Sequence, residues 1–304
     1  MSQAIGGQAV LEGVMMRGPR NWAVAVRTPT GSIAHVARTI DPIAARHWSL
    51  RLPVVRGVVA LGESLTIGFR ALGVSAGYAA QEEAEGYDEP AELGRWALAF
   101  AFLVAIGFAV MMFKVGPALL ADLLPISNGD WFVLVEGLIR VAVFVAYLTL
   151  LSFIPSLRRV FEYHAAEHKA INAYEAGEEL TPENAQRHSL IHPRCGTAFL
   201  LWVMVVGVFV YALLGRPVWY WLIISRIALL PVIAGVAYEL IRFAGKHSDN
   251  RVLMTLLAPG LWLQRLTTRE PTLDQLEVSI RALREVLAHE GRLQPADRRV
   301  EVMA

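Results

Sequence analysis

The chain has 304 residues, a formal net charge of +1, and 55% hydrophobic but only 18% charged residues. A soluble domain usually carries about 25% charged residues, so the composition indicates a protein that faces lipid over part of its surface. The near-zero net charge gives no sign of a nucleic-acid partner. The only cysteine is Cys195, which excludes a disulfide framework and favours a reducing compartment.

Residues 1–50 are predicted to form a small cytoplasmic β-rich unit. The segments at 21–27 (NWAVAVR) and 32–38 (SIAHVAR) alternate between apolar and other side chains, and a turn-forming TPTG lies between them. This pattern is typical of a β-hairpin. A unit of this size buries little apolar surface alone, so we expect it to pack on the rest of the protein.

Residues 51–95 are predicted to hold an amphipathic helix followed by an acidic linker. Arg56, Glu63 and Arg70 are seven residues apart and share one stripe of a helix over 53–80, whose remaining surface is apolar. Such a helix lies in the membrane interface or packs beneath a transmembrane bundle. Its three charges argue against a further membrane span. The acidic stretch 82–92 is expected to be a solvated linker.

Residues 96–241 are predicted to form a membrane domain. A spanning helix needs roughly 20 mostly apolar residues. Four segments meet this need, at 97–124, 131–157, 195–214 and 218–241. The expected fold is therefore mainly α: a four-helix transmembrane bundle with the small N-terminal β-hairpin unit, interfacial amphipathic helices and a C-terminal cytoplasmic helix.

The basic residues of the loops predict the orientation of these helices. The loop at 158–194 carries five Lys and Arg residues and the segment after residue 241 carries several more, whereas the other two connections carry one between them. Because positively charged loops remain on the cytoplasmic side, we expect a bacterial cytoplasmic-membrane protein with both termini and the long loop in the cytoplasm. The lipid bilayer is its expected environment.

Residues 242–304 are predicted to form an interfacial segment, a cytoplasmic helix and a polar tail. The apolar stretch 253–266 is interrupted by Pro259-Gly260, which favours an interfacial segment. Thr272 and Gln275 form a capping box. An apolar stripe with three- and four-residue spacing follows, which packs on this chain or on a second copy, and consists of Leu273, Leu276, Ile280, Leu283 and Leu287.

Several charged residues fall inside the predicted spans, and three of them are expected to lie close together. Glu136 and Arg140 are one helical turn apart, and Arg226 is expected at a similar depth in the last span. Ionisable groups in a membrane usually face the interior of the bundle. We expect an internal salt bridge, with a polar path or a lipid-headgroup site as the alternative.

The loop at 158–195 contains a candidate metal site. His164 and His168 are four residues apart, so on a helix both imidazoles project from one face and can reach a single metal ion. With Glu167 they form the His-x-x-Glu-His pattern of inverted zincins, in which the glutamate acts as the general base. The predicted ion is zinc.

A second cluster in the same loop strengthens this prediction. His192 and Cys195 lie directly before the next predicted span, and both are suitable zinc ligands. His188 is interpreted as an ordinary surface side chain. The predicted metal ligands are therefore His164, His168, His192 and Cys195, with Glu167 as the candidate catalytic residue.

Two kinds of site remain open at this point. Four protein ligands would make a closed, structural site, whereas three would leave a position for water beside Glu167. Glu239 is a further possible carboxylate ligand, and Glu175 is expected to form a cap or a salt bridge.

Three motifs together resemble the YqhQ family of bacterial multi-pass membrane proteins. They are GGQAVLEGVMMRGP near the start, YHAAEHKAINAYEAG with HPRCGTAFL in the middle, and PGLWLQRLTTREPTLDQLEVSIRAL near the end. The resemblance implies a cytoplasmic-membrane protein with a suspected metal site and without an established substrate.

The sequence therefore predicts a membrane protein with a cytoplasmic-face zinc site that acts as a hydrolase through its HxxEH motif. The alternative is a non-enzymatic membrane scaffold or assembly factor whose metal site is structural. Its partner would be another membrane protein or a second copy of the chain. A transporter is less well supported, because the sequence contains no inverted repeat.

Overall fold

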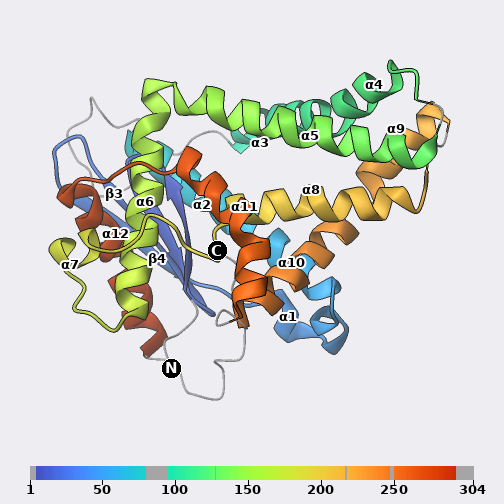
Figure 1. The fold of residues 1–304 in the computed structure, drawn as a ribbon. Helices are drawn as coiled ribbons and strands as arrows, with labels where there is room; N and C mark the ends of the chain where they lie inside the picture. Colours follow the sequence, from blue (N-terminus) through green and yellow to red (C-terminus); the bar gives the residue numbers. More distant parts are fainter. Residues whose placement is uncertain (1–4, 80–94, 127, 216–217, 247–249, 292–304) are drawn as a thin grey trace.

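The computed structural model describes residues 5–79, 95–126, 128–215, 218–246 and 250–291. The chain is mostly helical, with a small antiparallel sheet formed by its N-terminal residues (Figure 1). The predicted acidic linker at 82–92 and the polar tail after residue 291 lie outside the described residues.

The N-terminal unit is a four-stranded sheet rather than a single hairpin. Its strands pair antiparallel in sequence order and are β1 (Gly6–Val10), β2 (Gly13–Arg17), β3 (Asn21–Arg27) and β4 (Ile33–Thr39). The predicted hairpin is present as β3 and β4, with Asn21 opposite Thr39. The prediction was incomplete because every residue of β2 is buried, so its sequence lacks the alternation of a half-exposed strand.

Both faces of the sheet are covered. Val14 and Met16 lie in the core formed with α6 (Pro155–Glu175) and α12 (Leu273–Gly291), whereas Met15, between them, packs with α2 (Val55–Ala79) on the opposite face. This follows from the period of two along a strand. The N-terminal unit therefore packs on the rest of the chain, as predicted.

Helix α12 packs within its own chain. The predicted capping box is present, because the Thr272 backbone N–H donates to Gln275 Oε1 at 2.9 Å. Leu276, Ile280 and Leu283 of the predicted stripe are buried in the core, although Leu273 is 47% exposed. The two predicted partners for this stripe were this chain and a second copy. In the structure the stripe packs against the sheet and α6 of the same chain.

The helices indicate a membrane protein. Three stretches are long and apolar enough to cross a bilayer: 55–79, 99–122 and 131–152. They correspond to α2, to the continuous series α3 (Arg95–Val110), a π-helical turn (Met111–Val115) and α4 (Gly116–Asp122), and to α5 (Gly129–Ser152). A fourth is obtained if α9 (Trp219–Ala228) and α10 (Leu230–Lys246) form one span bent by 44°.

The prediction of four spans is therefore matched only in part by these helices. The helix expected over 218–241 is bent between α9 and α10. Pro231 lies in the first turn of α10, where proline is tolerated because a backbone N–H would have no partner in the helix there. Helix α8 (Gly196–Ala212), at 17 residues, is a shorter apolar helix. The span expected over 131–157 ends at Ser152, and α6 begins after it at Pro155.

Helix α2 is long and apolar enough to cross a bilayer, but two side chains of its charged stripe bond to other parts of the protein. Arg17 Nη2 donates to Glu63 at 2.7 Å, and Arg56 Nε donates to Glu239 at 2.7 Å. The helix lies along the sheet on one side and approaches α10 at Gly57, where an added Cβ would lie 2.8 Å from Tyr238. Helix α2 therefore packs between the sheet and α10.

Helix α11 (Arg251–Thr267) continues through Pro259, so the predicted break at Pro259-Gly260 was wrong. Gly260 lies against Ala198 of α8, where an added Cβ would be 3.3 Å from the Ala198 Cβ. Close packing of the two helices holds α11 together despite the missing hydrogen bond. The remaining short elements are α1 (Ile43–Arg46), a 3-10 turn (Trp48–Arg51) and α7 (Pro182–Gln186).

Candidate metal centre

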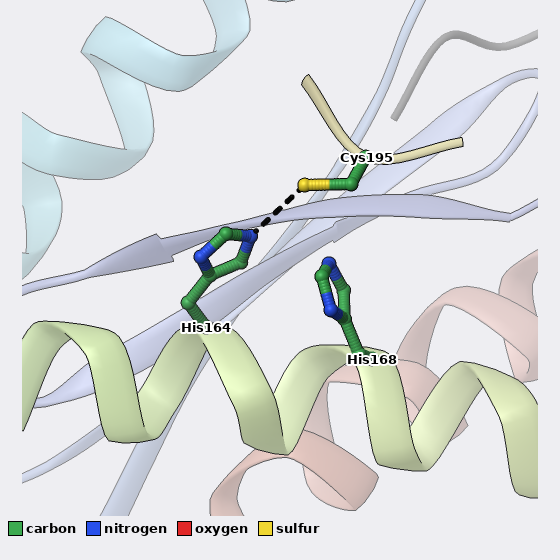
Figure 2. Close-up of side chains that lie close together, drawn as sticks. All are labelled: His164, His168 and Cys195. Carbon is green, nitrogen blue, oxygen red and sulfur yellow. Dashed lines mark hydrogen bonds between the residues drawn. The ribbon is translucent and has the colours of Figure 1, made fainter. Parts of the chain in front are cut away.

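Helix α6 positions the HxxEH motif. Ile154 is extended, Pro155 occupies the first turn of the helix, and the helix then runs unbroken to Glu175. Its Ala-rich middle packs on the sheet and α12, which holds the backbone of the motif in the core. His164 and His168 project from one side of this helix toward the residues that precede α8 (Figure 2).

Three of the four predicted ligands come together. The ligand atoms of His164, His168 and Cys195 all lie within 4.8 Å of one another, and Cys195 is contributed from 31 residues beyond His164. His164 Nε2 is 3.2 Å from Cys195 Sγ, and the two imidazole rings are 4.5 Å apart between centroids. The side chains converge on one point (Figure 2). No carboxylate of the described residues joins this group.

The hydrogen bonds of both histidines leave Nε2 available as a ligand. His164 Nδ1 lies 2.9 Å from the Thr267 carbonyl oxygen, and His168 Nδ1 lies 2.6 Å from that of Leu190. Because a carbonyl oxygen can only accept, each Nδ1 carries the proton. His168 Nε2 is buried and has no hydrogen-bond partner among the described residues. Metal-binding histidines are usually held in this way, by a donor bond from the other ring nitrogen.

Cys195 is a candidate thiolate. It is the N-cap residue of α8, and its Sγ lies 3.1 Å from Thr197 Oγ1. Burial alone would raise the pKa of Cys195, but the charge and hydrogen bond of His164 and the nearby His168 lower it well below its usual range. For His164 the two effects have the opposite signs: burial alone would lower its pKa, but Cys195 raises the pKa to about 9. Metal binding at such a pair releases the shared proton.

Glu167 is buried beside this group. Its side chain is 3% exposed and packs against Gly7 of β1, where an added Cβ would lie 2.8 Å from Glu167 Cγ. Burial raises the pKa of Glu167 to about 7, against the opposing charges of His168 and His164. The carboxylate forms no hydrogen bond or ion pair with the described part of the chain. It is therefore free to accept a proton.

His192, the fourth predicted ligand, is near this group but outside it. Its ring centroid lies 5.9 Å from that of His168, and its Nε2 lies 3.5 Å from Glu175 Oε2. Glu175 also pairs with Arg194. Burial alone would raise the pKa of Glu175, but the neighbouring His192 and Arg194 lower it to about 2. The salt bridge expected of Glu175 is therefore present with Arg194, whereas burial lowers the pKa of His192 and its Nε2 has no hydrogen-bond partner among the described residues.

Three polar residues that sequence reasoning missed hold the loop that carries Cys195. Gln264 of α11 is fully buried; its Oε1 accepts from the His192 backbone N–H, and its Nε2 donates to the His192 carbonyl, both at 2.9 Å. Lys169 Nζ donates to the Gln186 and His188 carbonyls, and Asn172 Nδ2 to those of Ser189 and Ile191. The three-residue spacing of Lys169, Asn172 and Glu175 on α6 is a signal that could have revealed part of this arrangement.

Two other residues considered from the sequence lie apart from the group. Glu239, a possible carboxylate ligand, instead pairs with Arg56. His188 lies 3.2 Å from Glu178 at the edge of the loop. Neither belongs to the group of three.

The fold and these residues define a multi-helix membrane protein with a buried His-His-Cys group beside a carboxylate. The family described as "Protein of unknown function (DUF1385)" matches residues 52–289. The chain is also 36% identical over 299 residues to the "Uncharacterized protein YqhQ" of Bacillus subtilis (strain 168), which covers 95% of this chain and 93% of that protein. The chain therefore belongs to this YqhQ-like family. No solved structure matches it.

Proposed function

We propose that this chain is a bacterial cytoplasmic-membrane protein with a zinc-dependent hydrolase site on its cytoplasmic face. Both termini would lie in the cytoplasm, following the distribution of basic residues. His164, His168 and Cys195 would bind the metal, with Glu167 as the general base. The observation that carries this proposal is that both histidines donate Nδ1–H to backbone carbonyls, which leaves two ring nitrogens directed at a thiol.

The donor set fits zinc. Two imidazole nitrogens and one thiolate are typical zinc ligands, and catalytic sites use three protein ligands and keep a fourth position open. When bound, zinc supplies Lewis-acid chemistry and lowers the pKa of water. Glu167 would then hold and transfer the proton, while the hydrogen bonds from His164 and His168 to Thr267 and Leu190 fix the ring orientations.

An open site is favoured over a structural clamp for two reasons. Gln264 bonds to the backbone of His192, and the His192 ring lies outside the group of three ligand atoms. In addition, Lys169 and Asn172 already attach the loop to α6 through backbone carbonyls, so a metal ion is not needed for that purpose. The alternative of a membrane scaffold or assembly factor would require His192 to become the fourth ligand.

Metal analysis of the purified full-length protein tests the site. Wild-type protein should contain about one equivalent of zinc, and the double variant His164→Ala/His168→Ala should contain almost none. His188→Ala is the matched control, because it removes a histidine of the same loop that lies outside the group. Unchanged zinc content in the double variant would refute the proposal.

Two further measurements distinguish an open site from a clamp. His192→Ala should keep its zinc if the site has three ligands and lose it if His192 is the fourth. Cobalt-substituted protein should change its visible absorption on addition of acetohydroxamate only if a coordination position is open. In Glu167→Gln the metal and this response should persist, while hydrolysis of any substrate is lost. Loss of zinc in His192→Ala, together with an unresponsive cobalt spectrum, would favour the scaffold.

A further inference from the structure

A second group of charged side chains lies among the apolar helices, where α5, α9 and the π-helical turn meet. Arg226 Nε donates to the two oxygens of Glu136 at 2.9 Å and 3.1 Å, and Arg140, one helical turn along α5, pairs with the same carboxylate. All three residues are at most 1% exposed. The predicted internal salt bridge is therefore present, with Arg226 as a second cation on one glutamate.

Lys114 adds a third cation to this group. It lies in the π-helical turn, is 7% exposed, and its Nζ has no hydrogen-bond partner among the described residues. Its Nζ faces the ring of Tyr211 at 5.8 Å from the centroid. The guanidinium carbons of Arg140 and Arg226 face the same ring at 5.4 Å and 4.1 Å.

The charges of this group do not balance. Among the described side chains, Glu136 pairs with Arg140 and Arg226 and so neutralises one of their two charges, whereas Lys114 Nζ has no hydrogen-bond partner. Unpaired charge is costly where water is excluded, particularly among membrane helices. The face of Tyr211 attracts cations but carries no net charge. An additional anion would balance the group and supply the acceptor that Lys114 lacks.

The backbone near Lys114 is also unusual. Pro117 has no N–H, so the carbonyl of Phe113 lacks the donor that an α-helix would provide four residues later. Arg140 Nε donates to this carbonyl at 2.9 Å. π-helical turns occur often at functional sites. Here the turn places Lys114 on the side of the helix that faces the two arginines.

We propose that Lys114, Arg140 and Arg226 bind a phosphate group, with Glu136 orienting the two guanidinium groups and Tyr211 forming one wall. Arginine forks and a lysine ammonium are the usual partners of phosphate. The phosphate belongs either to an anionic phospholipid headgroup, the abundant source at a membrane, or to a free anion. This site is separate from the metal centre and does not depend on it.

Thermal unfolding of lipid-depleted, full-length protein in detergent tests this site. The probes are inorganic phosphate, with chloride at equal ionic strength as the reference, and phosphatidylglycerol in mixed micelles. We expect one probe to raise the unfolding temperature of wild-type protein, and native mass spectrometry to show the bound phosphate or phospholipid. Lys114→Met should weaken this response roughly tenfold or more. Arg158→Met is the control, because Arg158 is 71% exposed and lies outside the group.

Without a probe, Lys114→Met should unfold at or above the temperature of wild-type protein, because it removes an unpartnered buried charge. A response to phosphate without lipid assigns a free anion, and a response to phosphatidylglycerol alone assigns a headgroup. Equal responses in Lys114→Met and wild type would overturn the proposal. If that variant does not fold, the wild-type measurements decide: protein that responds to neither probe and retains no phosphate or phospholipid overturns it.

Discussion

Replacement of Gln264 by leucine should loosen the loop that carries Cys195. Leucine has a similar volume but cannot hydrogen-bond to the backbone of His192. The His192 N–H would then be buried without a partner, whereas its carbonyl keeps a bond from the Cys195 N–H at 3.3 Å. An orphaned buried group costs about 1–3 kcal/mol, so with the weakened carbonyl the total loss is roughly 2–4 kcal/mol.

This loss can be measured by thermal unfolding of the full-length protein in detergent. For a chain of this size about 1 kcal/mol corresponds to a shift of roughly 2–4 °C, so Gln264→Leu should unfold roughly 4–16 °C below wild type. Because the same loop holds Cys195, zinc affinity should fall roughly 10–100-fold, as for other residues that orient ligands. Gln186→Leu is the matched control, since Gln186 bonds to the exposed Glu270. Equal unfolding temperatures for the two variants would refute the reasoning.

Two pairs of variants test the packing that supports α6. Leu276 is fully buried against α6 and the sheet, so Leu276→Ala should lower the free energy of unfolding by about 2–5 kcal/mol. Leu273 is 47% exposed, so its control variant Leu273→Ala should have little effect on the unfolding temperature. Gly7→Ala would place a methyl group 2.8 Å from Glu167, and should cost about 1–3 kcal/mol while zinc content stays normal. Gly62→Ala, in open space on α2, is its control; similar unfolding temperatures within either pair would contradict the packing described.

The local parts of the candidate metal site could be predicted from the sequence. His164 and His168 share a helical turn, and Cys195 precedes an apolar helix, so spacing and chain order both indicated a common site. The position of His192 could not be predicted, because it depends on Gln264, 72 residues away in a segment that reads as an apolar membrane-interface helix. Sequence spacing does not encode such long-range hydrogen bonds.

The fold was predictable to a similar extent. Apolar length located the long helices, and alternation found β3 and β4, but β2 is buried on both faces and therefore shows no period of two. The continuity of α11 through Pro259 depends on the packing of Gly260 against Ala198 rather than on local sequence. Lys114 lies in an otherwise apolar stretch, and the neighbouring sequence does not indicate that Tyr211 and Glu136 lie close to it.

The way the loop before α8 is fastened to α6 bears on how the protein would respond to loss of a metal ion. Ordinary hydrogen bonds hold this loop in place: Lys169, Asn172 and Gln264 donate to its backbone carbonyls. Zinc fingers, by contrast, unfold when the ion is removed, because binding supplies their folding free energy. A strong chelator should therefore strip this centre without melting the helix bundle, and re-addition of zinc should restore it without a refolding step.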